Sequence, residues 1–308
     1  MALKELAKNF WRKNFNLKPF EKVIIVFDNK REELARALSE TAVLFKADLG
    51  LVKIYDTELP PGIEERLIGA DIVVFLTEKS YSHHPLRVKA CEKGARIASL
   101  PKITSEIFKR AAQADFEKLA ARTRKLAELL TESKEVKITS TNGTNFTVNL
   151  QGKTGLLDIG NFTEPGKFGN FPAGEASLAP LLEGTSGVLV VDGRKKLFGP
   201  HPLIVRVEDG QVVAVEGPGS SVLEEAFSKY GEKARLIGEF GIGTNEQAHL
   251  ESIPLEAEKV MGTVHLALGN NLSFGGDNDV RFHLDLILAQ PTVSLDGALI
   301  IKKGKLLI

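Results

Sequence analysis

The stretch Lys22–Phe27, KVIIVF, is a short and almost wholly apolar run, typical of a strand that is buried on both faces. Apolar residues recur at helical spacing through residues 31–46, directly after it. The same alternation of strand-like and helix-like segments continues along the chain. Further strands are expected at 51–55, 71–76 and 95–99, and further helices at 63–68 and 85–94. Such alternation predicts an α/β domain with a parallel, Rossmann-like sheet and right-handed crossovers.

A change of pattern marks the expected domain boundary. The α/β domain is predicted to span residues 1–132 and to end in a long helical stretch at 104–132. From about residue 135 the chain has short alternating segments, and Asp209–Gly210 between two of them favours a hairpin. Residues 133–308 are therefore predicted to form a mostly antiparallel β domain with a main helix at 221–230. Its expected strands are 137–140, 145–149, 187–191, 203–208, 211–216, 264–268, 281–288 and 298–302.

Composition excludes several classes of partner. Lys+Arg and Asp+Glu both number 40, so no net charge favours nucleic acid or an anionic membrane. The single cysteine, Cys91, cannot form an intrachain disulfide and suits a reducing compartment. No run approaches the roughly 18 apolar residues of a transmembrane helix, and the N-terminus lacks a signal-type apolar core. We expect a cytoplasmic protein with neither nucleic-acid nor membrane partners.

Histidines and carboxylates of metal-ligand type gather in the second half. In residues 263–268, His265 faces away from its apolar neighbours Val264 and Leu266 if the segment is a strand. His283 and Asp285, two residues apart, then share one face of another strand. This period-2 placement predicts that the three side chains converge on one point.

Three glutamates extend this set. Glu239 lies in the apolar run Leu236–Phe240, where a carboxylate is costly to bury unless it is paired or binds a metal. Glu175 follows an Ala-Gly pair, and Glu258 lies in a charge-rich stretch that would equally suit a solvated face. Two imidazoles with several carboxylates are typical of a hydrolytic zinc-type site with one or two ions.

Four segments, in this order, resemble the M29 metallopeptidase family, the leucyl aminopeptidases of aminopeptidase T and S type. They are GNFPAGEASLAP (169–180), GEFGIGTN (238–245), EKVMGTVHLALGNN (258–271) and HLD (283–285). The resemblance implies a homodimer with two ions of zinc, cobalt or manganese on a mostly β domain. It also implies catalytic roles for Glu175 and Glu239, with Glu239 bridging the ions. The implied metal ligands are Glu175, Glu239, Glu258, His265, His283 and Asp285.

Departures from this pattern leave three functions open. A tyrosine of the family is replaced by Leu272, and the segment between His265 and His283 is short. The main expectation is a metallo-aminopeptidase acting on small peptides or amino-acid derivatives. The second is a non-haem Fe(II) ring-cleaving dioxygenase, because His265, His283 and Asp285 form a two-histidine, one-carboxylate set and a dihydroxypyridine dioxygenase uses this architecture. The third is a non-catalytic metal-binding protein.

The remaining candidates favour structural roles. His83 and His84 suit a surface turn, His201 a loop, and His249 an exposed position. Cys91 is expected to pack in the core. The segment 241–243, Gly-Ile-Gly, has only half of a dinucleotide fingerprint and lacks its third glycine. We therefore expect no metal ligand from the first domain.

Overall fold

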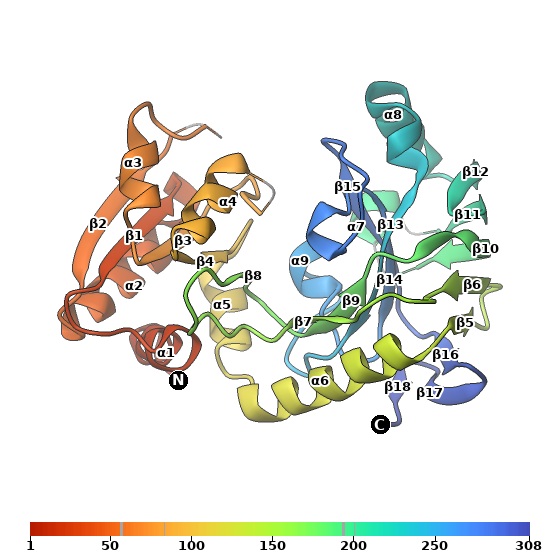
Figure 1. Ribbon diagram of the computed structural model, residues 1–308, viewed down its shortest axis with the longest axis horizontal. Helices are drawn as coiled ribbons and strands as arrows, with labels where there is room; N and C mark the ends of the chain where they lie inside the picture. The colour runs from red at the N-terminus through yellow and green to blue at the C-terminus, as the bar shows by residue number, and fades with distance from the viewer. Residues whose placement is uncertain (56–57, 83, 193–194, 200) are drawn as a thin grey trace. The chain divides into compact units, whose positions relative to one another are not determined.

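The computed structural model describes residues 1–308 except 56–57, 83, 193–194 and 200, and the chain divides into two compact units (Figure 1). The first unit contains Met1–Asp115 and Gly160–Ala173, and the second contains Phe116–Ile159 and Gly174–Ile308. A parallel α/β region followed by a separate antiparallel region confirms the predicted fold class. The division differs in detail from 1–132 and 133–308, because the helix at 116–132 belongs to the second unit and residues 160–173 return to the first.

The first unit is built on one parallel sheet. Its described strands lie in the order β2 (Asp48–Lys53), β1 (Lys22–Phe27), β3 (Ile72–Leu76), β4 (Arg96–Ser99) and β8 (Phe168–Asn170). Each neighbouring pair is parallel. The first four strands are those that the apolar runs predict. The fifth, β8, comes from the returning segment and could not be recognised from its three residues alone.

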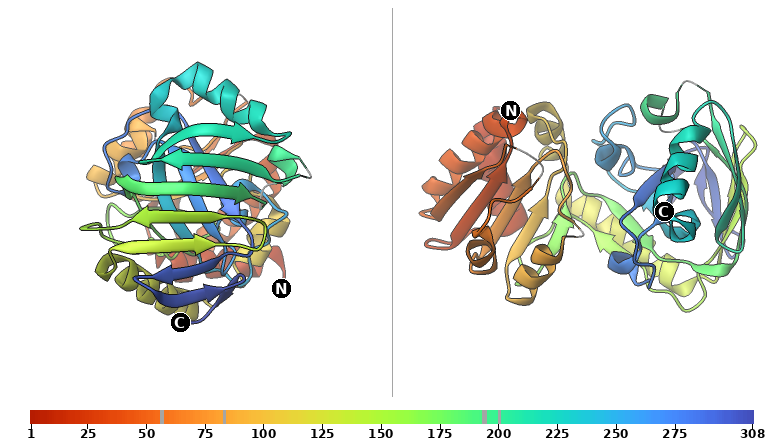
Figure 2. Two further views of the ribbon diagram at one scale, coloured as in Figure 1. Left: turned by 90° about the vertical axis from the view of Figure 1, so that its right-hand side faces the viewer. Right: turned by 90° about the horizontal axis from the view of Figure 1, so that it is seen from above.

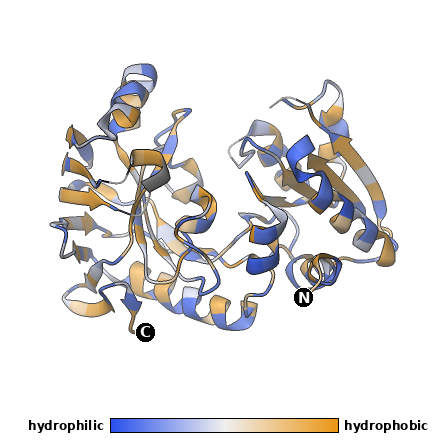
Figure 3. Cartoon of the chain, turned by 180° about the vertical axis from the view of Figure 1, so that it is seen from behind, coloured by the Kyte–Doolittle hydropathy of each residue, from blue (hydrophilic) through white to orange (hydrophobic). Residues whose placement is uncertain are grey.

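Helices cover both faces of this parallel sheet, which explains why its central strands β1 and β3 are almost wholly apolar and buried (Figure 3). Ile24 and Val26 of β1 face a cluster that includes Leu67 and Leu86, whereas Val23 and Ile25 are buried on the opposite face. The helices of this unit are α1 (Leu3–Phe10), α2 (Glu32–Leu44), α3 (Ile63–Ile68), α4 (Pro85–Glu92) and α5 (Ser105–Ala111).

The second unit contains two sheets with antiparallel pairing. The larger, seen face-on in Figure 2 (left), lies in the order β12 (Gln211–Glu216), β11 (Leu203–Glu208), β10 (Leu181–Val191), β6 (Asn145–Asn149), β5 (Glu135–Thr139), β16 (Thr292–Leu295), β17 (Ala298–Lys302) and β18 (Lys305–Leu306). The smaller lies in the order β15 (His283–Leu288), β14 (Val264–Gly269), β13 (Ile237–Gly243), β9 (Glu175–Leu178) and β7 (Leu156–Asp158).

One apolar core joins the two sheets of the second unit. Phe146 and Leu189 from the larger sheet belong to the same buried cluster as Phe240 and Leu266 from the smaller one. Leu126 of α6 also lies in this cluster. The helices of the unit are α6 (Phe116–Glu132), α7 (Lys195–Phe198), α8 (Ser220–Tyr230) and α9 (Pro254–Ala257). In neither unit does a described helix have the length and apolar character needed to cross a bilayer.

Two local expectations are corrected by the fold. The helical stretch predicted over 104–132 is broken into α5 and α6, and α6 starts directly after Asp115, a residue type favoured at helix starts. Strand β13 was not expected, because glycine at 238, 241 and 243 disfavours a strand when only propensity is considered. Packing requires these glycines, as the site shows.

Candidate metal centre

The smaller sheet of the second unit has two chemically different faces. Phe240, Leu266 and Leu286 lie on one face and belong to the apolar core. The other face carries Glu239 and His265, which are also buried. Because side chains alternate along each strand, the same segments supply both the core and the polar site.

Small residues lie beside the polar side chains on the site face. The register places Ala267 opposite both Glu239 and Asp285, and Gly241 opposite His265. A Cβ atom on Gly241 would lie 2.2 Å from Nε2 of His265, so only glycine leaves room for this ring. The Gly-Ile-Gly segment of β13 therefore leaves space for the imidazole of His265 on the neighbouring strand, and we assign it no role in binding a dinucleotide.

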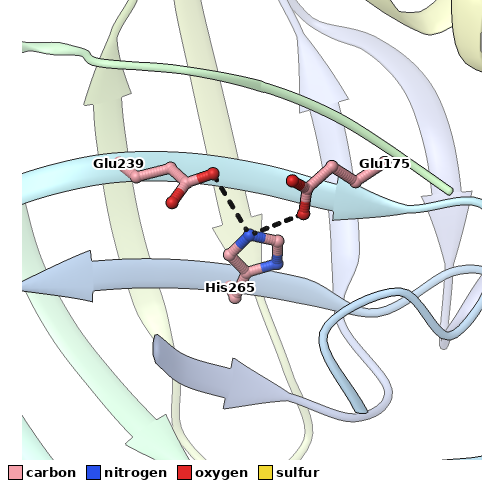
Figure 4. Close-up of side chains that lie close together, drawn as sticks. All are labelled: Glu175, Glu239 and His265. Carbon is pink, nitrogen blue, oxygen red and sulfur yellow. Dashed lines mark ion pairs between the residues drawn. The ribbon is translucent and has the colours of Figure 1, made fainter. Parts of the chain in front are cut away.

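Five of the six predicted ligands come together in two groups that share Glu239. In the first, which we call the inner group, Nε2 of His265 lies 3.3 Å from Glu175 and 3.6 Å from Glu239, and the ring is between the two carboxylates (Figure 4). In the second, the outer group, Nε2 of His283 lies 3.3 Å from Glu239 and 3.4 Å from Asp285. Within each group the ligand atoms lie within 4.8 Å of one another. The two histidines thus belong to different groups, unlike the two-histidine, one-carboxylate set considered from sequence.

The two groups differ in access. The side chains of Glu175, Glu239 and His265 are exposed by 7%, 2% and 1%. Those of His283 and Asp285 are exposed by 21% and 12%. A small molecule can therefore reach the outer group more readily than the inner one.

The His283 ring is held in a defined orientation. Its Nδ1 donates to the backbone carbonyl of Asn270 at 2.9 Å, because a carbonyl oxygen can only accept. This leaves Nε2 directed at Glu239 and Asp285, the arrangement that metal-binding histidines commonly show. Phe274 stacks on the ring, with centroids 5.5 Å apart and planes 14° apart. The segment between β14 and β15 thus orients the ring and adds an aromatic surface beside it.

Strong electrostatic coupling links these groups. Burial alone would lower the pKa of His265 and His283, but the adjacent carboxylates outweigh burial and raise the pKa of both rings well above the usual value. Burial would raise the pKa of Glu175, but Lys259 and His265 lower it to about 2. Likewise, His283 overcomes burial and holds the pKa of Asp285 well below its ordinary value. Protons on the rings and a metal ion therefore compete for the same carboxylates.

A buried lysine beside the site was missed from sequence. Lys259 is 1% exposed, and its ammonium group pairs with Glu175, Glu258 and Asp158. Glu258 itself belongs to neither ligand group, although it is buried and hydrogen-bonded to Asp285. Burial and the nearby charge of Asp285 raise the pKa of Glu258 well above its ordinary value. In sequence, Lys259 stands in a charge-rich stretch that gave no sign of burial.

The donor set fits a divalent cation. Oε2 of Glu175 and Oε1 of Glu239 are buried and face Nε2 of His265 at 3.3 and 3.6 Å, but neither accepts a hydrogen bond of good geometry from the described residues. A buried acceptor in this condition is costly unless something satisfies it. Carboxylate and imidazole atoms this close together are suitable first-row metal ligands. The sequence therefore identified a carboxylate–histidine group able to hold an ion. The number of ions, two, and their identity as zinc, cobalt or manganese stay predictions from the sequence resemblance.

The other sequence candidates that the structure describes belong to neither ligand group. His84 caps α4 by accepting from the Leu86 amide, and His83 lies outside the described residues. His201 and His249 are exposed, and Cys91 packs against the core of the first unit. Leu272, at the position of the family tyrosine, begins a short 3-10 turn and is 51% exposed.

Comparisons with known proteins were made on sequence and on structure. The NicX family model, described as 2,5-dihydroxypyridine 5,6-dioxygenase, matches residues 16–308. A 2,5-dihydroxypyridine 5,6-dioxygenase of Pseudomonas putida is 22% identical over 260 residues, covering 78% of this chain and 72% of the relative.

Two solved structures share the fold. The 2,5-dihydroxypyridine dioxygenase of Pseudomonas putida has a TM-score of 0.84 at 18% identity, covering 100% of this chain and 98% of that one. AmpT of Thermus thermophilus has a TM-score of 0.72 at 16% identity, with 99% of each chain covered.

These findings correct the functional expectation. The predicted metallo-aminopeptidase of the M29 family is wrong, because the family model and the curated relative are dioxygenases. The relation to AmpT is one of fold, which explains why the M29 motifs could be recognised in the sequence. The match over residues 16–308 shows that the chain belongs to the 2,5-dihydroxypyridine 5,6-dioxygenase (NicX) family of enzymes.

Proposed function

We propose that this protein is a metal-dependent ring-cleaving dioxygenase whose substrate is a hydroxylated pyridine of the 2,5-dihydroxypyridine class. The observation that carries the proposal is the family match over nearly the whole chain, together with a buried carboxylate–histidine group in the matched region. In the reaction, one O₂ is consumed per ring, the C5–C6 bond breaks, and both oxygen atoms enter the product.

The outer group suits the reactive ion best. Glu239, His283 and Asp285 would hold it, and their partial exposure leaves a side from which substrate can approach. When bound, a redox-active ion such as Fe(II) would supply the electron transfer that lets O₂ react with an electron-rich ring. His283 keeps Nε2 free for this role by donating through Nδ1 to Asn270. Two carboxylates and one imidazole would neutralise the charge of a divalent ion.

Phe274 supports an aromatic substrate. Its ring lies parallel to that of His283, at the more exposed end of the ligand set. A planar heteroaromatic ring would pack against this surface, since aromatic pairs gain about 0.5–1.5 kcal/mol beyond simple burial.

The homodimer implied by the sequence resemblance stays a prediction.

Oxygen consumption tests the proposed reaction. Metal-free protein would be loaded anaerobically with Fe(II), Mn(II) or Zn(II), and 2,5-dihydroxypyridine or its carbocyclic counterpart 1,4-dihydroxybenzene would then be added. We expect Fe(II)-dependent uptake of one O₂ per pyridine consumed, and two ¹⁸O atoms in the product when ¹⁸O₂ is used. Product carrying a single ¹⁸O atom, or no uptake with any of the metals, would refute the proposal. Equal rates on both rings would refute the pyridine specificity.

A further inference from the structure

The buried side chains of the segment between β14 and β15 are asparagines. Of residues 270–282, all of which the structure describes, only Asn270, Asn271 and Asn278 are buried. The residues between Asn271 and Asn278 are partly or fully exposed, and two of them are glycines. Hydrogen bonds of the buried asparagines therefore hold most of a segment that supplies both contacts of the His283 ring.

Asn278 holds the residues on both sides of Asn270. Its Nδ2 donates to the carbonyl of Gly269, the last residue of β14, at 2.8 Å. Its backbone N–H donates to Oδ1 of Asn271 at 2.7 Å, and its backbone carbonyl accepts from the N–H of Asn271 at 3.2 Å. Asn270, whose carbonyl accepts from Nδ1 of His283, thus lies between two residues that are each bonded to Asn278.

A further bond of the Asn278 amide reaches outside the segment. Nδ2 also donates to the carbonyl of Lys233 at 2.9 Å, in the 3-10 turn Glu232–Arg235 that precedes β13. One amide group thus ties the end of β14 to the turn before its neighbouring strand. Both partners are carbonyls, which only accept, so the side chain at position 278 has to donate. A carboxylate of the same shape would place an oxygen against two other oxygens.

The pair formed by Asn271 and Asn278 also holds Phe274. The backbone carbonyl of Asn271 accepts from the N–H groups of Phe274 at 2.9 Å and of Gly276 at 3.1 Å. A Cβ atom on Gly276 would lie 2.2 Å from Cγ of Asn271, so the chain turns closely around this side chain. The turn presents the Phe274 ring to that of His283. The pair therefore acts on the hydrogen bond of His283 and on its aromatic neighbour together.

We propose that Asn278 is a positioning residue for the reaction: through Gly269 and Asn271 it fixes the carbonyl of Asn270, and so the direction in which His283 presents Nε2. The inference rests on the proposed function, because His283 is taken as a ligand of the reactive ion. Loss of the group that orients a metal-binding histidine typically costs about 10–100-fold in metal affinity. Asn278 holds that group in place, so we expect its loss to cost about tenfold, the lower end of this range.

A purely structural role for Asn278 makes a different prediction. If the residue only stabilised the fold, its loss should lower the free energy of unfolding and leave His283 unchanged in the folded protein. Asn149 offers a comparison in the same unit, since its Nδ2 also donates to a backbone carbonyl, that of Glu183 at 2.8 Å, in the larger sheet. The properties of His283 therefore separate the two roles.

The test uses Asn278→Asp, which keeps the shape of the side chain but removes the donor, with Asn149→Asp as the matched control. In the metal-free full-length proteins, NMR follows the Nδ1 proton of His283, whose hydrogen bond to Asn270 slows its exchange with water. We expect about tenfold faster exchange in Asn278→Asp, as the loss of one hydrogen bond predicts, and no change in Asn149→Asp. Calorimetric titration with Mn²⁺ should show about tenfold weaker binding in Asn278→Asp alone.

An unchanged exchange rate of the His283 proton, or an unchanged affinity for Mn²⁺, in a folded Asn278→Asp protein would overturn the inference. Equal changes in the Asn278→Asp and Asn149→Asp proteins would overturn it as well. Should Asn278→Asp not fold, Asn278→Ala, which removes the donor without adding a charge, is judged by the same two measurements. Failure of the proposed function would appear differently: exchange and affinity would change as expected, but the wild type would consume no O₂.

Discussion

At the scale of single residues, the site depends on which atom each ligand presents. Asp285 contributes a carboxylate next to His283, and the pKa of Asp285 is held well below its ordinary value despite burial. It is therefore charged at neutral pH and available to a cation. The same pairing makes the carboxylate an acceptor for the imidazole when no metal competes.

Asp285→Asn should weaken metal binding, because it removes a negative ligand while keeping the shape of the side chain. We expect a loss of affinity larger than the roughly 10–100-fold that loss of an outer hydrogen-bond partner costs at metal sites. Calorimetric titration with Fe(II) or Mn(II) measures this directly. Asp48→Asn, on an exposed carboxylate of the first unit, is the matched control and should change nothing. Unchanged affinity in Asp285→Asn would remove this residue from the ligand set.

Gly241→Ala should displace the His265 ring, since the added Cβ would lie 2.2 Å from its Nε2. Overpacking of this kind costs typically about 1–3 kcal/mol of the free energy of unfolding. Chemical denaturation should detect this loss, and the NMR signal of the ring should shift. Gly50→Ala is the control, because there the nearest atom is the flexible end of Arg66 at 3.0 Å. Equal stability of the two variants would contradict the close approach seen in β13.

At the scale of elements, the segment between β14 and β15 does most to shape the outer group. Asn270 orients His283 through its backbone, and Phe274 covers the ring. Leu272, two residues before Phe274, is exposed, and we assign it no part in orienting or covering the His283 ring. The segment thus separates residues for binding from residues for solvent contact.

Phe274→Ala should raise KM for the aromatic substrate by about tenfold, the equivalent of losing one aromatic pair of up to about 1.5 kcal/mol. The number of bound ions should stay unchanged, because Phe274 supplies no ligand. Steady-state oxygen uptake gives KM and kcat, and metal analysis gives the ion count. In Leu272→Ala, KM should match that of the wild type. An effect of Phe274→Ala on kcat alone would argue against substrate stacking.

In the first unit, an ion pair links the start of α2 to the segment after β3. Nη1 of the buried Arg31 lies 2.8 Å from Glu78, and this hydrogen bond lowers the pKa of Glu78. A carboxylate with a lowered pKa in the folded state stabilises the protein above its unfolded pKa, near 4.3, and loses that contribution as pH falls through the folded pKa. Glu78 is 43% exposed, so solvent screening limits the effect.

Glu78→Gln should therefore be less stable than the wild type at pH 7, and the difference should shrink as pH falls from about 4.3 through the lowered folded pKa, below which both side chains are neutral. Urea denaturation at pH 7, 5 and 3.5 follows the difference in unfolding free energy. If the difference in unfolding free energy between the two proteins grew as the pH fell, the ion pair between Arg31 and Glu78 would not be stabilising the folded protein at neutral pH.

At the scale of the whole molecule, the chain crosses between its two units more than once. Residues 160–173 leave the second unit, add β8 to the parallel sheet and return. Helix α6 belongs to the second unit, because its residues Leu126 and Leu130 are buried in the core of that unit. Each unit is therefore assembled from segments that are discontinuous in sequence.

Leu126→Ala should destabilise the second unit by about 2–5 kcal/mol, the usual cost of truncating a fully buried leucine. Hydrogen exchange followed by mass spectrometry locates the effect. We expect faster exchange in β6 and β10 than in the wild type, with β1 and β3 little changed. Leu129→Ala, at a partly buried position on the same helix, should have a smaller effect. Faster exchange confined to β1 and β3 would assign α6 to the first unit.

The fold class could be predicted from the sequence, as could the clustering of five ligand-type residues. Apolar runs such as Lys22–Phe27 predict parallel strands because burial on both faces demands them. Period-2 placement predicted that His265, His283 and Asp285 share a sheet face, since alternation along a strand is a local property. Sequence motifs alone favoured the wrong chemistry, because a dioxygenase and a peptidase share this fold.

Three other features depend on contacts between segments that are distant in the sequence. The buried state of Lys259 depends on carboxylates from distant segments, which no local pattern records. The grouping of His265 and His283 around a shared Glu239 depends on strand order and register. Strand β13 forms through its glycines because neighbouring strands and the His265 ring approach so closely, although local propensity disfavours it. In each case, long-range packing outweighs the preferences that a short stretch of sequence can express.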